Sequence, residues 1–196
     1  MNFLVIEASL ETSFVLLSIK HLIFCTRLAS RDTQNHLLCA IEKLLKKHQL
    51  SLKDLNFISV GRGPGAFTST RIAICLAKTL CFSNQIPLVP FLSPMVYTPP
   101  ISEPFLLLID AKSRGVYAYN GADVTLLELP LSKCVLSKRL YSPHPSSLPF
   151  PTLLVPINIP FLVHHLETSF VAGKTVSPYK LRASYPELQE PRGSFA

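Results

Sequence analysis

The segment from Phe57 to Phe91 most limits the folds that this chain can adopt. Phe57 to Gly61 is an apolar run typical of a buried strand, and the sharp loop Gly63-Pro64-Gly65 follows it. Thr68 to Phe82 predicts a helix, and Ile86 to Phe91 predicts another strand. The chain therefore contains a strand, a glycine loop, a helix and a strand in this order.

The N-terminal segment predicts three strands and an amphipathic helix. Three short apolar runs, separated by polar breaks, indicate a strand meander; they are Phe3 to Ile6, Ser13 to Ile19 and Leu22 to Arg27. From Asn35 to Gln49 the apolar residues recur at helical spacing, and lysines occupy the opposite side.

The second half of the chain predicts a hairpin and then a segment interrupted by proline. Phe105 to Ile109, Val116 to Tyr119 and Val124 to Leu129 indicate three antiparallel strands. Leu140 to Leu166 has no Asp, Glu, Lys or Arg, but its repeated prolines prevent a membrane-spanning helix. From Tyr141 these prolines suppress regular structure over roughly twenty residues. Beyond them, only Phe161 to Leu166 and Pro178 to Arg182 suggest further elements.

The composition excludes some classes of protein. Hydrophobic residues make up 48% of the 196 residues and charged residues 16%, which excludes a disordered chain. The net charge of +7 is compatible with an acidic or nucleic-acid partner, although no aromatic residues interleave the basic ones. The five cysteines form no Cys-x-x-Cys pair, and the N-terminus has no signal-peptide pattern, so we expect reduced thiols in the cytosol.

The loop Gly63-Pro64-Gly65 is a candidate phosphate site. A glycine loop that opens a helix presents backbone amides to an anion, which makes Gly63, Gly65, Thr68 and Arg71 candidate binding residues. The loop lacks the lysine of a phosphate-binding loop and the third glycine of a dinucleotide fingerprint. A tight structural turn is therefore the favoured interpretation, and a phosphate-binding loop is the alternative.

Other polar residues give no catalytic set. Asp110 ends a predicted strand, where a turn-capping role is favoured over a catalytic one. His164 and His165 are adjacent and would point to opposite faces of a strand, so we expect no metal site there. No glycine-flanked serine marks a nucleophile elbow.

Two strings of residues resemble the TsaB family. They are Val-Gly-Arg-Gly-Pro-Gly-Ala-Phe-Thr-Ser-Thr-Arg-Ile at Val60 to Ile72 and Ile-Asp-Ala-Lys-Ser-Arg-Gly-Val-Tyr at Ile109 to Tyr117. They come in the family's order, after the helix at His36 to Leu45 and before the strand Ile86-Pro87-Leu88-Val89. The resemblance covers about residues 1 to 120 and, beyond them, Tyr179 to Arg182, which is similar to the family's closing strand.

This resemblance implies an α/β fold of the actin/Hsp70/sugar-kinase (ribonuclease H-like) class. It implies an N-terminal lobe at residues 1–100 and a smaller, Pro-rich lobe at residues 101–196. It further implies a non-catalytic subunit that helps to add a threonylcarbamoyl group to the adenosine beside the anticodon of tRNAs reading ANN codons. In this family the subunit is the dimerisation partner and scaffold of TsaD, and TsaE joins them.

The resemblance also implies which ligands bind to the partner subunits and not to this chain. We expect ATP and a metal ion on the partner subunits, no cofactor on this chain, tRNA contact only through the complex, and no membrane association. A homodimer in the absence of the partner is left open.

The resemblance places the partner interface on two helices, Asn35 to Gln49 and Thr68 to Phe82. Ala73, Ala77 and Cys81 form a stripe of small residues that permits close approach of another helix. The candidate interface residues are therefore these three with His36 and Ile41. Packing of the stripe on the chain's own sheet is the alternative.

The chain departs from the family pattern in several places. Glu7-Ala8-Ser9 replaces the usual Asp-Thr-Ser, Ser69 replaces a glycine, and prolines at residues 94, 99 and 100 interrupt an expected helix. The Pro-rich segment 142–160 is expected to replace a regular helix and strand. A nucleotide-dependent phosphotransferase of the sugar-kinase type is the alternative function, but the hairpin from Glu7 to Ser13 lacks the glycine that this chemistry needs.

Overall fold

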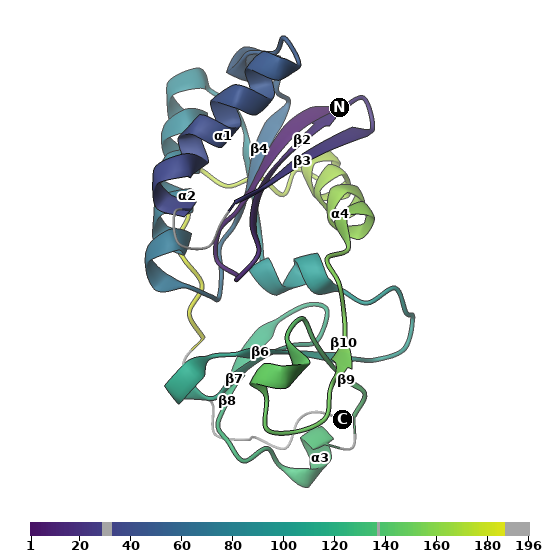
Figure 1. Ribbon diagram of the computed structural model, residues 1–196. Helices are drawn as coiled ribbons and strands as arrows, with labels where there is room; N and C mark the ends of the chain where they lie inside the picture. The colour runs from purple at the N-terminus through teal and green to yellow at the C-terminus, as the bar shows by residue number, and fades with distance from the viewer. Residues whose placement is uncertain (29–32, 137, 187–196) are drawn as a thin grey trace. The chain divides into compact units, whose positions relative to one another are not determined.

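The computed structural model describes residues 1–28, 33–136 and 138–186, with only the main chain described at 33–35, 113 and 134. It divides into two units, drawn in Figure 1: Met1–Ser93 with Val163–Ser184, and a second built on Pro94–Leu162. The sequence analysis placed the boundary at residue 100, whereas the first segment of the first unit ends at Ser93. The sequence prediction did not assign the segment from Val163 to the first unit.

The first unit is a five-stranded sheet in the order β3-β2-β1-β4-β5. Its strands are β1 (Asn2–Glu7), β2 (Ser13–Ile19), β3 (Leu22–Leu28), β4 (Phe57–Gly61) and β5 (Leu88–Phe91). β1 is antiparallel to β2 and parallel to β4, which is parallel to β5. These elements confirm the predicted meander and the strand, loop, helix, strand order.

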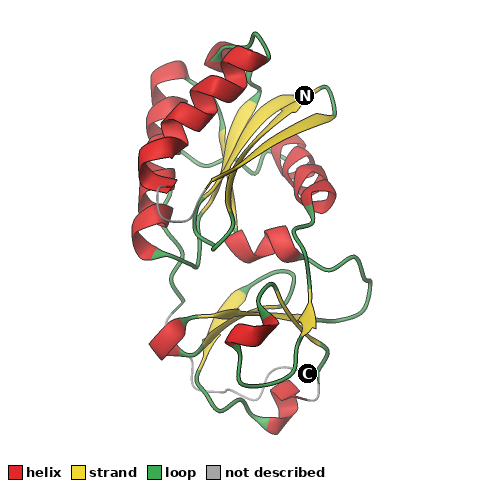
Figure 2. Ribbon diagram, in the orientation of Figure 1, coloured by secondary structure: helices red, strands yellow, loops and turns green. Residues whose placement is uncertain are grey.

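Helices cover both faces of this sheet (Figure 2). α1 (Thr33–Lys47) and α2 (Phe67–Asn84) lie on one face, and α4 (Ile159–Val171) lies on the other. Successive side chains of a strand point to opposite faces of the sheet, so they pack against different helices. Leu4 and Ile58 belong to the core cluster shared with α1 and α2, whereas Phe57 stacks between Phe3 and Phe170.

The second unit is a five-stranded sheet in the order β10-β9-β6-β7-β8. β6 (Leu106–Asp110), β7 (Val116–Tyr119) and β8 (Val124–Leu127) form the predicted antiparallel meander. The short strands β9 (Leu140–Ser142) and β10 (Leu153–Leu154) add to it in parallel, and α3 (Lys133–Leu136) lies between β8 and β9 in the chain.

Short 3-10 helices complete the described chain: η1 (Leu52–Asp54), η2 (Ser93–Tyr97), η3 (Lys112–Arg114) and η4 (Pro145–Ser147). The segment 142–160 thus retains the short strand β10 and the single turn η4. Within the described residues, no helix is both long and apolar enough to cross a membrane.

Two predictions for the C-terminal part were wrong. His164 and His165 lie on the helix α4 and not on a strand, because Leu162, Val163 and Leu166 bury one helical face. Pro160 is tolerated there because the first turn of a helix leaves its N–H groups unpaired. Tyr179 to Arg182 forms no strand; instead Val176 makes an isolated bridge to Leu88 of β5.

Candidate functional site

Glu7, the last residue of β1, has a fully buried carboxylate. Oε1 accepts a hydrogen bond of 2.6 Å from the Ser9 N–H, and Oε2 has no partner among the described residues. A Cβ on Gly61 of β4 would collide with Oε2, so glycine is required opposite this carboxylate. Burial raises the pKa of Glu7, and the hydrogen bond from Ser9 opposes only part of this rise.

Ser93 joins the hairpin after β1 to the glycine loop before α2. Its Oγ accepts a hydrogen bond of 3.0 Å from the Gly63 N–H and donates one of 2.9 Å to the Ser9 Oγ. Its own N–H donates to the Gly63 carbonyl oxygen at 3.0 Å. The sequence analysis did not identify Ser93, because the residues that bind it are distant in the chain.

The glycine loop is in direct contact with this hairpin. The Ser9 carbonyl oxygen accepts a hydrogen bond of 2.6 Å from the Ala66 N–H, immediately before α2. A Cβ on Gly65 would overlap this same oxygen. Gly63 has a φ of +86°, a conformation that favours glycine. Both glycines therefore have a structural reason to be present.

The other two loop candidates, Thr68 and Arg71, take no part in these contacts. Thr68 is exposed in the first turn of α2. The Arg71 guanidinium lies over the Phe67 ring, 3.7 Å from its centroid, in a cation–π contact. Among the described residues, no hydrogen bond or ion pair of the Thr68 or Arg71 side chain joins it to Gly63 or Gly65.

Four of the five candidate interface residues are buried in the chain's own core. Ile41, Ala73, Ala77 and Cys81 are at most 1% exposed and belong to one core cluster with residues of β1 and β4. Their place on the partner interface is corrected, because the small-residue stripe faces the sheet and lets α2 lie close to it. Only His36 of the five is exposed.

The opposite face of α2 is uncharged, and all of its residues except the half-buried Ile72 are exposed. Ile72, Cys75, Thr79 and Phe82 recur there at helical spacing; we call these four residues the α2 outer face. Phe82 is 61% exposed and touches Tyr179 edge to face. A helix face in water normally carries charged residues, so this one has the character of a partner surface.

The charged residues of α2 bind their own chain instead. Arg71 stacks on Phe67, and the Lys78 Nζ donates to the Leu181 carbonyl oxygen at 3.5 Å. On the neighbouring helix α1, Leu38 is 45% exposed. The sequence signal that could have identified the α2 outer face is the absence of charge at its four positions. The sequence analysis did not use it, because the buried stripe of small residues on the other side of α2 is uncharged as well.

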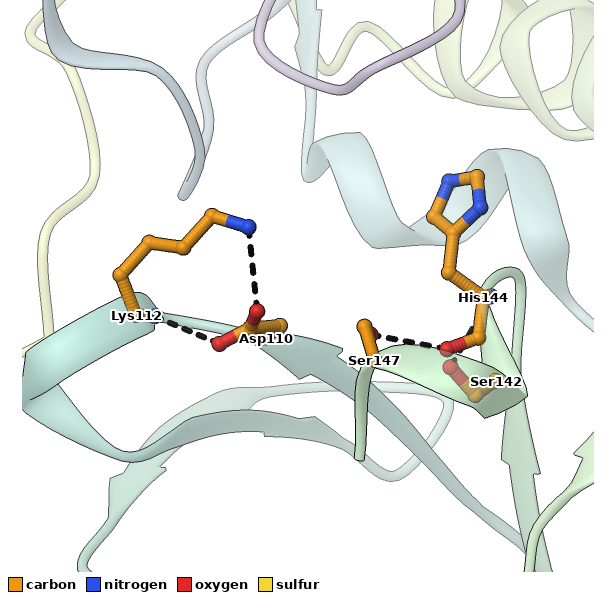
Figure 3. A network of polar contacts seen from close by, with 5 residues as sticks. All are labelled: Asp110, Lys112, Ser142, His144 and Ser147. Atoms are coloured by element: carbon orange, nitrogen blue, oxygen red, sulfur yellow. Dashed lines mark hydrogen bonds and ion pairs between the residues drawn. The ribbon is translucent and has the colours of Figure 1, made fainter. Parts of the chain in front are cut away.

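Asp110 stabilises a turn, as the favoured interpretation predicted. Its Oδ1 accepts a hydrogen bond of 2.7 Å from the Lys112 N–H, and its Oδ2 lies 3.1 Å from the Lys112 Nζ (Figure 3). In the same view, Ser142 and Ser147 hydrogen-bond to the main chain of His144. Among the described residues, no group of three or more His, Cys, Asp or Glu side chains could hold a metal ion.

Comparison with known proteins identifies the family. Residues 24–135, more than half of the chain, match the family model described as TsaD, tRNA N6-adenosine threonylcarbamoyltransferase. Two proteins named tRNA threonylcarbamoyladenosine biosynthesis protein TsaB are similar. One, from Buchnera aphidicola, is 41% identical over 54 residues, and the other, from Escherichia coli, is 34% identical over 62 residues.

These matches cover part of each chain. They include 28% and 32% of this chain but only 24% and 27% of the two relatives, so the chain matches about a quarter of their length. The structure of YeaZ from Pseudomonas aeruginosa has a TM-score of 0.75 at 18% identity and covers 94% of this chain and 100% of its own. This likeness confirms the predicted fold class. The family model, together with the relatives named TsaB, shows that the chain belongs to the TsaB/YeaZ family.

Proposed function

We propose that this chain is a non-catalytic subunit of the machinery that adds threonylcarbamoyl to the adenosine beside the anticodon of tRNAs reading ANN codons. It acts in the cytoplasm as the dimerisation partner and scaffold of TsaD, together with TsaE. ATP and the metal ion bind to those partner subunits, and tRNA is reached through the complex. Membership of the TsaB/YeaZ family supports this role.

The α2 outer face carries this proposal. An uncharged helix face with Cys75 and Thr79 at its centre and Phe82 near its end suits close packing against another helix. Leu38 on the neighbouring helix α1 is a further exposed apolar residue of the first unit. We place the TsaD contact on these residues, in place of the buried stripe.

The contact between Ser9 and the glycine loop opposes the phosphotransferase alternative. A kinase of this fold needs space between the first hairpin and a glycine loop for phosphate groups. Here the Ser9 carbonyl oxygen uses the Ala66 N–H and abuts Gly65, and Glu7 directs a buried carboxylate at Gly61. Acceptor oxygen atoms in these positions occupy the space and the N–H group that a phosphate would need.

Size-exclusion chromatography with light scattering tests the interface. We expect the chain and TsaD of the same organism to elute together with the mass of a heterodimer. Cys75→Arg places a charge in the centre of the α2 outer face and should abolish this complex, because a buried unpaired charge costs several kcal/mol. Val171→Arg is the matched control, because Val171 is an exposed apolar helix residue on α4. Equal binding by both variants would exclude the proposed face.

A further inference from the structure

A groove between β3 and α1 is separate from the surface proposed for TsaD. Its volume is about 510 Å³, and both elements belong to the first unit. Phe24 and Leu28 from β3 and Leu44 from α1 give it apolar walls, and Lys43 and Lys47 line it from α1. Leu38 does not line the groove, so the two surfaces can be tested separately.

The outer edge of β3 has no strand beside it among the described residues. β3 is the last strand of the sheet and pairs along its whole length with β2, from Ser13 with Leu28 to Ile19 with Leu22. The pairing is continuous, so β3 contains no bulge that would turn this edge away. Natural sheets usually protect such an edge with bulges, prolines or several charges, whereas Arg27 is the only charged residue of β3.

The turn between β2 and β3 determines which main-chain groups point outward. Lys20 and His21 have φ angles of 46° and 76°, as in the two-residue turn that makes its flanking pair hydrogen-bonded. Hydrogen-bonded and non-hydrogen-bonded pairs then alternate along the ladder. Ile23, Cys25 and Arg27 therefore direct their N–H and C=O groups to the outer edge.

The groove includes this edge. The consecutive residues 23 to 26 all line it, although neighbouring side chains of a strand point to opposite faces. The groove must therefore reach the main chain of β3. An extended peptide placed there can pair with the strand and insert alternate side chains beside α1.

The charge of the groove selects the kind of peptide. Lys43 and Lys47 line it, and the lining residues that the structure describes include no Asp or Glu. The whole chain carries a net charge of +7, so a second copy would bring two basic grooves together. The His48 ring lies against the Phe24 ring, with centroids 3.8 Å apart, so this face of Phe24 is not open to a nucleotide base.

We propose that this groove binds an extended acidic segment of a partner protein, which adds a sixth strand to the sheet along β3. Main-chain hydrogen bonds to β3 provide affinity, and Lys43 and Lys47 select acidic side chains. This proposal goes beyond the role as a TsaD scaffold and does not depend on it.

Fluorescence anisotropy with a synthetic probe tests the charge selection. The probe is a fluorescein-labelled nine-residue peptide that alternates Val and Glu, and a Val/Lys peptide of equal length is its control. We expect only the Val/Glu peptide to bind, and Lys43→Glu/Lys47→Glu to weaken it by about tenfold or more. Lys46→Glu/Lys53→Glu makes the same charge change outside the groove and should weaken binding much less. Equal effects of the two double variants would overturn the proposal.

N-methylated probes test the strand pairing without changing the protein. Methylation of alternate peptide amides blocks one edge of the added strand, and methylation of the other amides blocks the opposite edge. One of the two peptides should lose binding and the other should retain it, while bound peptide protects Cys25 from alkylation but leaves Cys75 reactive. Equal binding of both peptides, absence of binding, or displacement by single-stranded oligouridine would each contradict the proposal, the last in favour of RNA.

Discussion

The Ser9 carbonyl oxygen accepts a hydrogen bond of 2.6 Å from the Ala66 N–H and thereby holds the hairpin after β1 against the loop before α2. Gly65→Ala would place a methyl group on that oxygen. The Ser9 carbonyl and the Ala66 N–H are main-chain groups and cannot move aside as a flexible side chain would. We therefore expect a loss of roughly 1–3 kcal/mol in the free energy of unfolding, measured with urea.

Gly173→Ala is the control for this substitution. Gly173 has a φ of +71°, and a Cβ added there would meet no atom within 4 Å, so only backbone strain of about 1 kcal/mol is expected. A loss no greater at Gly65 than at Gly173 would mean that the loop and the hairpin separate easily.

Gly61→Ala tests the packing of the buried Glu7 carboxylate. The added methyl group would collide with Glu7 Oε2 and come close to the Ser93 Oγ. We expect Gly61→Ala alone to lower the melting temperature, and the addition of Glu7→Ala to recover part of the loss by removing the colliding carboxylate. Purely additive effects in this double-mutant cycle would show that the two residues do not interact.

Glu7→Gln should change how stability depends on pH. The pKa of Glu7 is raised in the folded state, so the folded chain retains a proton that the unfolded chain releases near pH 4.5. Wild-type stability therefore falls as pH rises from 4.5 through the folded-state pKa. The substituted glutamine cannot ionise, so this variant should gain stability relative to wild type between pH 5 and pH 8 in urea unfolding. A constant difference across this range would exclude a raised pKa.

The cysteines should react at different rates with iodoacetamide. Cys25 and Cys75 are exposed, whereas Cys81 is buried and its pKa is raised to about 12. Mass spectrometry should detect alkylation of Cys75 and Cys25 in the folded chain, more slowly at Cys25 because burial raises the pKa of its thiol, and of Cys81 only after unfolding. Binding of TsaD should protect Cys75 but not Cys25. Rapid alkylation of Cys81 without denaturant would contradict its place in the core.

The sequence predicted most elements of the first unit because their periodicity is strong. It could not decide which face of α2 meets the sheet, because Ala73 and Ala77 on one face and Cys75 and Thr79 on the other are all uncharged. Only the packing against β1 and β4 separates them. Ala77→Arg would consequently test the stability of the core and not the partner interface.

Other features depend on contacts between distant segments. Ser93 meets Ser9 and Gly63 only after the sheet has formed, so local patterns do not mark it. The helix α4 was missed because the prolines before it, including Pro160 in its first turn, obscured its apolar spacing. The free edge of β3 depends on strand order, which no local pattern of apolar residues records.

Single-turnover modification of tRNA tests the central proposal most directly. TsaD, TsaE, ATP and the threonylcarbamoyl donor would be incubated with an ANN-reading tRNA, with and without this chain. We predict rapid modification only when the chain is present, and loss of this stimulation with Cys75→Arg but not with Val171→Arg. Full modification without the chain, or ATP hydrolysis by the chain alone, would contradict its role as a non-catalytic scaffold.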